Sequence, residues 1–157
     1  MQSKILFFSI LAIILGINIG CGKKFAENIQ DKHIIPYVPV YTQIDLGIGG
    51  ENPNWTDRPR YFNLSYDGKA LGYRGHGIII YSNNNTDFVC YDATCTNCTD
   101  LTSYFTQKDL EGWKATCPVC GTQFLLIQGT PTNNEKEIYP LKSYYITKSS
   151  NKLIVSN

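Results

Sequence analysis

Two short segments carry the strongest chemical signal of this chain: CTNC at residues 95–98 and CPVCG at residues 117–121. A CxxC pair on a tight turn brings two sulfur atoms to one point, and a second pair 18 residues further on closes a tetrahedral four-thiolate site. Pro118 stiffens the second turn, and Gly121 can take a positive φ that lets backbone N–H groups point at sulfur. The sequence therefore predicts four metal ligands, which are Cys95, Cys98, Cys117 and Cys120.

The chemistry of this site stays open between a bound metal and paired disulfides. Thiolates are soft ligands that select zinc or iron–sulfur clusters over calcium or magnesium. Cysteines of exported proteins, however, commonly oxidise to disulfides. Cys90 belongs to a strand-like run, and we expect a buried, inert thiol there rather than a fifth ligand. His33 and His76 find no vacant ligand position, so we expect them to be structural or solvent-exposed.

Evenly spaced apolar runs on both sides of the two cysteine segments predict an all-β domain over residues 35–157. The chain has eleven Tyr and seven Phe against one Met, which favours strands because aromatic rings pack well on a pleated surface. Three consecutive isoleucines within 77–81 predict a strand that is buried on both faces. The segment 100–112 fits either a short helix or a loop. The other strands are expected within 36–46, at 61–66 with 71–73 as its hairpin partner, and at 88–91, 113–116, 124–128, 144–147 and 153–156.

The N-terminal region has the organisation of an export signal. Lys4 precedes an apolar run over 5–17, which is shorter than the about 20 residues that a membrane-spanning helix needs. The run leads to Cys21 and resembles a bacterial lipoprotein signal, in which the cysteine is lipidated and becomes the new N-terminus. An ordinary cleaved signal or a retained anchor is the alternative. We therefore expect a signal peptide at 1–20 and a polar tether at 21–34.

Without this signal the chain carries 13 basic and 13 acidic residues, because Lys4 is the only charge removed. A balanced surface lacks the basic footprint of a nucleic-acid-binding protein. Acyl chains at Cys21 hold a protein on a membrane. We expect an exported protein, lipid-anchored to a bacterial membrane and facing the periplasm or the cell exterior. Trp55, Tyr61 and Tyr73 are assigned to the core or, alternatively, to an exposed patch for a partner or a glycan.

The second half of the chain resembles the Rieske iron–sulfur domain family over residues 75–157. The likeness is carried by DFVCYD at 87–92, by CPVCGTQF at 117–124 and by the Pro-Leu pair at 140–141. Through PYVPV at 36–40 and GHGIIIY at 75–81 the chain also resembles a group of uncharacterised exported bacterial lipoproteins with Rieske-like folds.

The resemblance implies a Rieske-like fold of three stacked antiparallel sheets, with two loops at one tip in a metal-binding subdomain at about 90–125. It also implies that Gly121 and Thr122 lie beside the cofactor. In the family each loop supplies one Cys and one His, whereas here Cys98 and Cys120 occupy the two histidine positions. A [2Fe–2S] cluster held by four cysteines would have a lower reduction potential than one with two histidine ligands.

Two functions follow, and neither gives the domain a catalytic reaction of its own. In the first, a [2Fe–2S] cluster carries single electrons to a redox protein partner. In the second, Zn²⁺ or disulfides only staple the two loops of a structural or binding module, because a closed four-thiolate zinc has no open position for water. The signal contains no arginine pair, so the chain crosses the membrane unfolded and takes up its metal outside, which favours zinc. The family likeness favours the cluster.

Overall fold

The computed structural model describes residues 34–46, 54–132 and 139–157. The expected signal peptide, Cys21 and the tether up to His33 lie outside the described residues. Within the described ranges, no helix has the length and apolar character needed to cross a bilayer.

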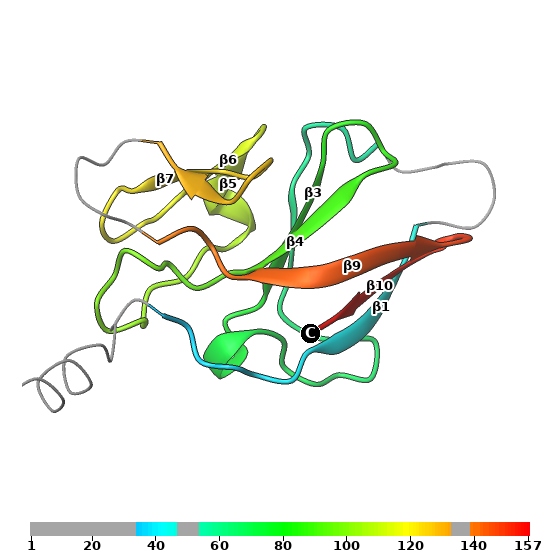
Figure 1. The fold of residues 1–157 in the computed structure, drawn as a ribbon, viewed down its shortest axis with the longest axis horizontal. Coiled ribbons are helices and arrows are strands. Elements are labelled where there is room, and N and C mark those ends of the chain that lie inside the picture. Colours follow the sequence, from blue (N-terminus) through cyan, green and yellow to red (C-terminus); the bar gives the residue numbers. More distant parts are fainter. Residues whose placement is uncertain (1–33, 47–53, 133–138) are drawn as a thin grey trace, which may run out of the picture. The chain divides into compact units, whose positions relative to one another are not determined.

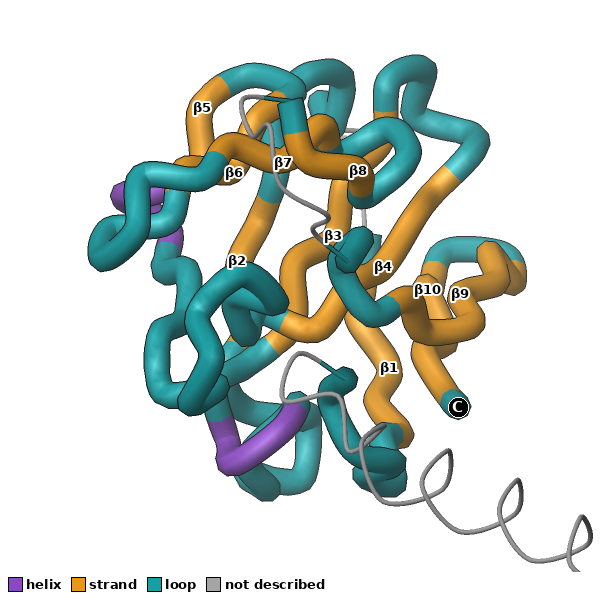
Figure 2. Tube along the Cα trace, turned by 60° about the vertical axis from the view of Figure 1, so that its left-hand side comes forward, coloured by secondary structure: helices purple, strands orange, loops and turns teal. Residues whose placement is uncertain are grey.

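The larger of two antiparallel sheets has six strands in the order β1-β10-β9-β4-β3-β2 (Figures 1 and 2). Strands distant in the chain are neighbours here, since the first strand pairs with the last. The bounds are β1 Tyr41–Asp45, β2 Arg60–Phe62, β3 Ile78–Ser82, β4 Phe88–Asp92, β9 Ser143–Ser149 and β10 Lys152–Ser156.

The smaller sheet has four short strands in sequence order, β5-β6-β7-β8, and it carries the second cysteine segment between β6 and β7. Two 3₁₀ turns, η1 and η2, lie in the connections. The bounds are η1 Tyr73–Gly75, η2 Gln107–Asp109, β5 Leu110–Glu111, β6 Lys114–Thr116, β7 Gln123–Leu125 and β8 Thr130–Pro131.

The all-β prediction is confirmed, but the three expected sheets form two hydrogen-bonded sheets. The reason is β9, which pairs with β4 at its start through Ser143 and Tyr144 and with β10 over the rest of its length. One long strand therefore joins what would otherwise be two separate sheets.

Several local predictions need correction. The strand expected at 61–66 is only β2, and its partner is β3 rather than 71–73. The expected hairpin is reduced to a single bridge between Leu64 and Ala70, because Gly72 takes a left-handed φ of 75° and the chain turns into η1. The segment 100–112 is a loop containing η2 and the start of the small sheet, so its loop alternative is correct.

Strand β3 forms the wall between two hydrophobic clusters. All five of its residues are buried, as the isoleucine run predicts. Ile79 and Tyr81 face the cluster under the cysteine loops, while Ile78 and Ile80 face the other one. Alternate side chains of a strand point to opposite faces, so the run serves both clusters at once. Burial of each isoleucine contributes roughly 1.5–3 kcal/mol.

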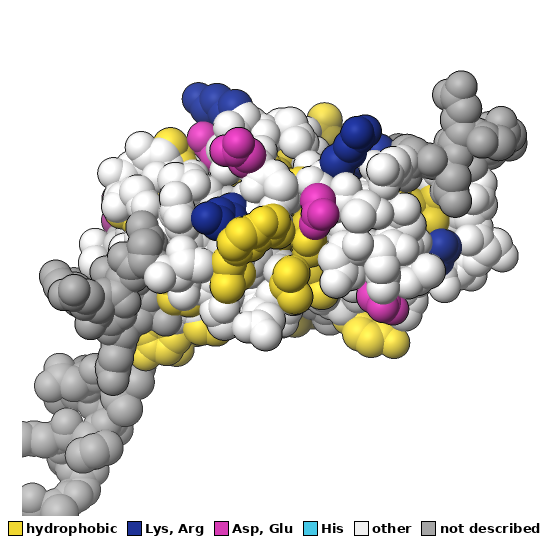
Figure 3. Space-filling model, turned by 90° about the horizontal axis from the view of Figure 1, so that it is seen from above, with side chains coloured by type: hydrophobic (Ala, Val, Ile, Leu, Met, Phe, Trp, Pro, Cys, Tyr) yellow, Lys and Arg dark blue, Asp and Glu magenta, His cyan; other side chains and the backbone are white. Residues whose placement is uncertain are grey.

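The aromatic residues left open between core and patch are mostly used for packing. Trp55 is 1% exposed, stacks on Phe62 and meets the ring of Phe88 edge-on. Tyr61 and Tyr73 are half-buried. Acidic and basic side chains are intermixed on the face drawn in Figure 3, in keeping with the balanced charge count.

Gly72 offers a test of this packing, because a Cβ atom there would overlap the carbonyl oxygen of Gly77. Gly68 has nearly the same φ, 78° against 75°, but nothing lies within 4 Å of its added Cβ. We expect Gly68→Ala to cost about 1–2 kcal/mol of unfolding free energy from the left-handed backbone alone. Gly72→Ala should cost about 1–3 kcal/mol more, since backbone must move. Urea unfolding measures both, and equal losses would contradict the close approach.

Candidate metal centre

The first cysteine loop begins where β4 ends and is tied down at its base. The backbone N–H of Cys95 donates to the carbonyl of Ser103 (2.9 Å), and that of Phe105 donates to Ala93 (2.8 Å). The turn closes when Leu101 N–H donates to the carbonyl of Cys98 (3.0 Å). These bonds hold both sulfur atoms of the loop at a fixed place beside the small sheet.

The second cysteine loop is the turn of the β6–β7 hairpin. The N–H of Cys117 donates to the carbonyl of Thr122 (2.8 Å), and the N–H of Gly121 donates back to the carbonyl of Cys117 (3.0 Å). Gly121 has a φ of 71°, the positive value that the sequence pattern requires of it. The loop therefore has the tight knuckle geometry expected of CPVCG.

The two loops bring all four predicted sulfur atoms to one point. Each sulfur lies within 4.8 Å of the other three. Across the loops, Cys95 and Cys120 sulfurs are 3.7 Å apart, and those of Cys98 and Cys117 are 3.8 Å apart. A metal with bonds to sulfur of about 2.3 Å has tetrahedral ligands about 3.8 Å from one another. The donor set therefore fits a bound metal, and the cysteines that the structure describes are all free thiols.

Burial differs sharply among the four cysteines. Cys95, Cys98 and Cys117 are 0%, 8% and 2% exposed and belong to the hydrophobic cluster that contains Phe105 and Phe124. Cys120 is exposed at the rim of the tip. The centre is thus anchored in the core on three sides and meets solvent on the fourth.

Hydrogen-bond donors surround the sulfurs of the second loop. Ser103 Oγ lies 3.1 Å from Cys117 Sγ, so its hydroxyl donates when that sulfur is a thiolate. Backbone N–H groups of Cys120 and Val119 also bond to Cys117. Asn97 Nδ2 donates to Cys120 Sγ at 3.6 Å. Such donors stabilise negative charge on sulfur and orient it.

Thr122 and Asn97 extend this network. Thr122 is buried, its Oγ1 lies 3.2 Å from Cys120 Sγ, and Asn97 Nδ2 donates to that oxygen at 2.6 Å. The structure therefore places Thr122 beside a predicted ligand. Gly121 acts through its backbone conformation.

Three of the thiols, those of Cys95, Cys98 and Cys117, have pKa values far from the usual one. The pKa of Cys117 falls to about 4, chiefly because the Cys95 thiol hydrogen-bonds to its thiolate, with help from backbone N–H groups and Ser103. The pKa of Cys95 rises in return. Burial is the main cause that raises the pKa of Cys98 to about 12. Of these three sulfurs, that of Cys117 therefore ionises most readily, and a bound metal would favour the thiolate form of every ligand.

Asp92 is a supporting residue that sequence reasoning missed. Its carboxylate is fully buried and accepts hydrogen bonds from the backbone of Thr94 (2.8 Å) and Tyr73 (2.6 Å) and from the hydroxyl of Tyr144 (2.6 Å). Thr94 directly precedes Cys95, so Asp92 fixes the start of the ligand loop to β9. In the sequence, the only sign of this role is that Asp92 directly follows the apolar run 88–91, and an aspartate at that place is also common in ordinary turns.

The remaining candidates lie outside the four-sulfur group. Cys90 is 1% exposed on β4, and burial raises the pKa of its thiol well above the usual value. His76 stacks on Tyr104 with ring centroids 4.6 Å apart, and its Nδ1 lies 2.9 Å from Thr94 Oγ1. Burial lowers the pKa of His76. Cys90 and His76 therefore pack against neighbouring residues and do not belong to the group of four sulfur ligands.

Comparison with known proteins finds solved structures that have a fold similar to that of this chain. No family model and no curated protein matches the sequence. A chain from the complex of reduced oxygenase and oxidized ferredoxin in carbazole 1,9a-dioxygenase is 16% identical (TM-score 0.49), covering 74% of this chain and 92% of that one. The Sphingomonas yanoikuyae B1 ferredoxin is 16% identical (TM-score 0.44; 65% and 87% covered). The ferredoxin of carbazole 1,9a-dioxygenase from Nocardioides aromaticivorans IC177 is 14% identical (TM-score 0.42; 73% and 96%). These likenesses concern the fold alone, and the metal centre rests on the positions of this chain's own four sulfur atoms.

The Ser103 contact predicts a measurable effect on metal affinity. Ser103→Ala removes a buried donor to Cys117 without removing a sulfur, so we expect affinity for Zn²⁺ to fall about 10-fold or more. Competition with a chromogenic chelator measures this affinity. Ser149→Ala, at the exposed end of β9, is the matched control and should leave it unchanged. Equal affinities for both variants would show that the hydroxyl does not support the centre.

Proposed function

We propose that the domain is a zinc-stapled structural or binding module, exported and held on a bacterial membrane by lipid at Cys21. A single Zn²⁺ ion bound by Cys95, Cys98, Cys117 and Cys120 joins the two loops of its tip. The observation that carries this proposal is the closeness of the four sulfur atoms: no two of them are more than 4.8 Å apart.

This spacing favours one ion over a two-iron cluster. In a [2Fe–2S] cluster each iron takes two of the four protein ligands, and sulfide bridges lie between the irons. The two thiolate pairs then stand apart by the width of the cluster. Here all four sulfurs, from both loops, lie within 4.8 Å of one another, so they do not divide into two separated pairs. They lie near the edge of about 3.8 Å of a single zinc tetrahedron.

The order of export and metal loading also favours zinc. Residues 1–20 contain no arginine pair, so a chain using this signal crosses the membrane unfolded and collects its metal afterwards. Zinc needs no assembly machinery, and four thiolates complete its coordination. Bound there, zinc supplies folding free energy and no redox or hydrolytic chemistry. The chain's own part is to position four sulfurs and to neutralise their charge with N–H and O–H donors.

An electron carrier with a [2Fe–2S] cluster and a redox protein partner is the second candidate. One observation favours it: Cys120 is exposed, so one ligand sulfur lies at the surface where a partner could approach. The metal itself distinguishes the two candidates.

Metal analysis of the full chain, purified in detergent without oxygen, tests the proposal. We expect one zinc ion per chain, a colourless sample, and the visible absorption of tetrahedral cobalt thiolate after Co²⁺ exchange. Cys117→Ser should lose the metal and unfold more easily, because one of four ligands is gone. Cys90→Ala is the matched control and should keep it. Iron with sulfide and an EPR signal in the reduced state would establish the electron carrier instead.

The lipid anchor is tested separately through Cys21. Cys21→Ser should abolish labelling by radioactive palmitate and leave the precursor uncleaved, because a hydroxyl cannot take the thioether-linked lipid. Cys90→Ser, which changes a buried thiol, should be labelled as the parent chain is. Equal labelling of Cys21→Ser and the parent would remove the anchor from the proposal.

A further inference from the structure

A groove lined by tyrosines lies away from the metal centre, and none of its lining residues belongs to the two cysteine loops or to the small sheet. Its volume is about 490 Å³, within the range of small-molecule sites. The walls come from the segment entering β1, the turn after β2 and the end of β10. We name it the tyrosine groove; its lining includes Tyr37, Tyr41, Tyr66, Asp67, Lys69 and Ser156.

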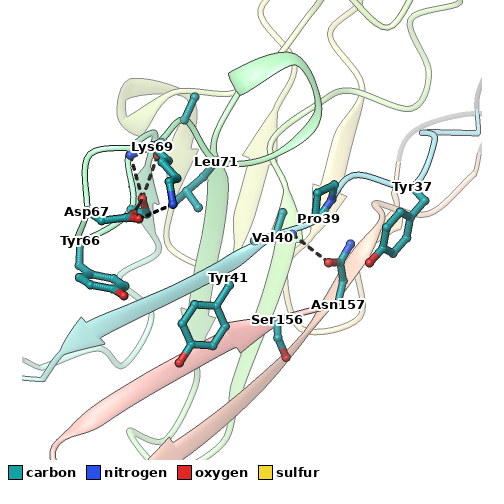
Figure 4. A pocket seen from close by; sticks show the side chains of 12 residues that line it. Tyr37, Pro39, Val40, Tyr41, Tyr66, Asp67, Lys69, Leu71, Ser156 and Asn157 are labelled. Carbon is teal, nitrogen blue, oxygen red and sulfur yellow. Dashed lines mark hydrogen bonds and ion pairs between the residues drawn. The ribbon is translucent and has the colours of Figure 1, made fainter.

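Three tyrosine rings are spread along the tyrosine groove. In Figure 4, Tyr66 lies at one end, Tyr41 in the middle and Tyr37 at the other end. Their exposed fractions are 67%, 54% and 72%, in contrast to the buried aromatics of the core. A row of exposed rings offers flat apolar platforms at successive positions, and tyrosine orders at low entropic cost because it has few rotatable bonds.

The turn that forms one wall is held by its own hydrogen bonds. Ser65 N–H donates to the carbonyl of Lys69 (2.8 Å), and Lys69 N–H donates to Ser65 Oγ (2.9 Å). Gly68 N–H also donates to the carbonyl of Ser65 (3.0 Å). Tyr66 and Asp67 therefore project from a closed turn.

The opposite wall is fixed from the end of β10. The side chain of Asn157 accepts from Val40 N–H (2.9 Å) and donates to the carbonyl of Val38. Lys142 Nζ lies 5.8 Å from the ring of Tyr37 and donates to the carbonyl of Pro36 (2.7 Å). With both walls fixed before binding, a ligand pays little to order them.

The two charged side chains in the lining of the tyrosine groove, Asp67 and Lys69, pair with each other. Lys69 Nζ and Asp67 Oδ2 form an ion pair at 2.7 Å (Figure 4). The hydrogen bond from Lys69, together with one from Ser65, lowers the pKa of Asp67 to about 2, so the carboxylate stays ionised in ordinary buffers. Because its charged side chains are already paired, the lining gives little preference for phosphates, nucleotides or acidic peptides. Its polar groups offer an acceptor next to a donor.

We propose that the tyrosine groove binds an uncharged oligosaccharide. Such a ligand is amphipathic: the C–H faces of its rings suit the tyrosine platforms, and its neighbouring hydroxyls suit the paired carboxylate and ammonium groups of Asp67 and Lys69. A chain of several sugar rings can also contact more than one of these aromatic platforms. This site goes beyond the zinc staple and does not depend on which metal the tip holds.

A proline-rich peptide is the competing occupant, because aromatic grooves also take such segments. Proline rings would pack on the tyrosine rings, but they have no hydroxyl groups that could hydrogen-bond to Asp67 and Lys69. The ion pair at the side of the groove therefore favours the sugar.

Calorimetric titration of the full chain tests the proposal, in a detergent without a sugar headgroup. The probes are cellotriose, maltotriose, mannotriose and triacetylchitotriose, with a decaproline peptide as the competitor class. We expect saturable binding of at least one trisaccharide with a Kd on the order of 1 mM or tighter. Tyr66→Ala should weaken it about tenfold, as loss of a stacking platform does at a binding hot spot.

Matched variants separate ring stacking from general effects. Tyr66→Phe keeps the platform and should bind nearly as the parent chain does. Tyr145→Ala removes a ring of similar exposure, 68%, that does not line the groove, and should change nothing. Failure of all four trisaccharides to bind, binding of decaproline alone, or equal affinity for Tyr66→Ala and the parent would overturn the proposal.

Discussion

Four sulfur atoms confined within 4.8 Å of one another are the constraint on which the domain depends. Four thiolates at this distance repel strongly, so the arrangement is favourable only when protons or a cation neutralise them. The protein accommodates them by placing three of the cysteines in an apolar cluster and by directing N–H and O–H donors at the sulfurs. The backbone geometry of the loops and the packing beneath them both hold the four sulfur atoms at the spacing of a metal tetrahedron.

The parts of this site that could be predicted from the sequence are the local ones. A CxxC spacing determines where two sulfurs of one turn go, and a proline and a glycine at fixed offsets determine the second turn. The isoleucine run of β3 is likewise local, because burial on both faces requires every residue to be apolar. The parts that escaped prediction depend on distant partners. Asp92 supports the first cysteine loop only because it accepts a hydrogen bond from Tyr144, which is 52 residues away. Ser103 supports the centre only because the second cysteine loop places Cys117 beside it in the folded chain.

The hairpin error has the same origin. Residues 61–66 and the Asp67–Gly68 turn fit a two-stranded hairpin by every local criterion. The structure uses the turn but pairs β2 with β3, because the buried isoleucines offer a better neighbour than 71–73 does. Local rules predicted the turn, and the competition between partners decided the pairing. The tyrosine groove arises beside this turn from segments that meet only in the folded chain.

The strand β9 has a consequence for how the domain opens. Its first residues are bonded to β4 and its remaining ones to β10, so neither half of the large sheet can separate without breaking bonds of the same strand. Its start is also tied to the first cysteine loop through Asp92. Opening either half of the large sheet therefore disturbs β9 and the first cysteine loop together, so the two halves should melt as one cooperative unit.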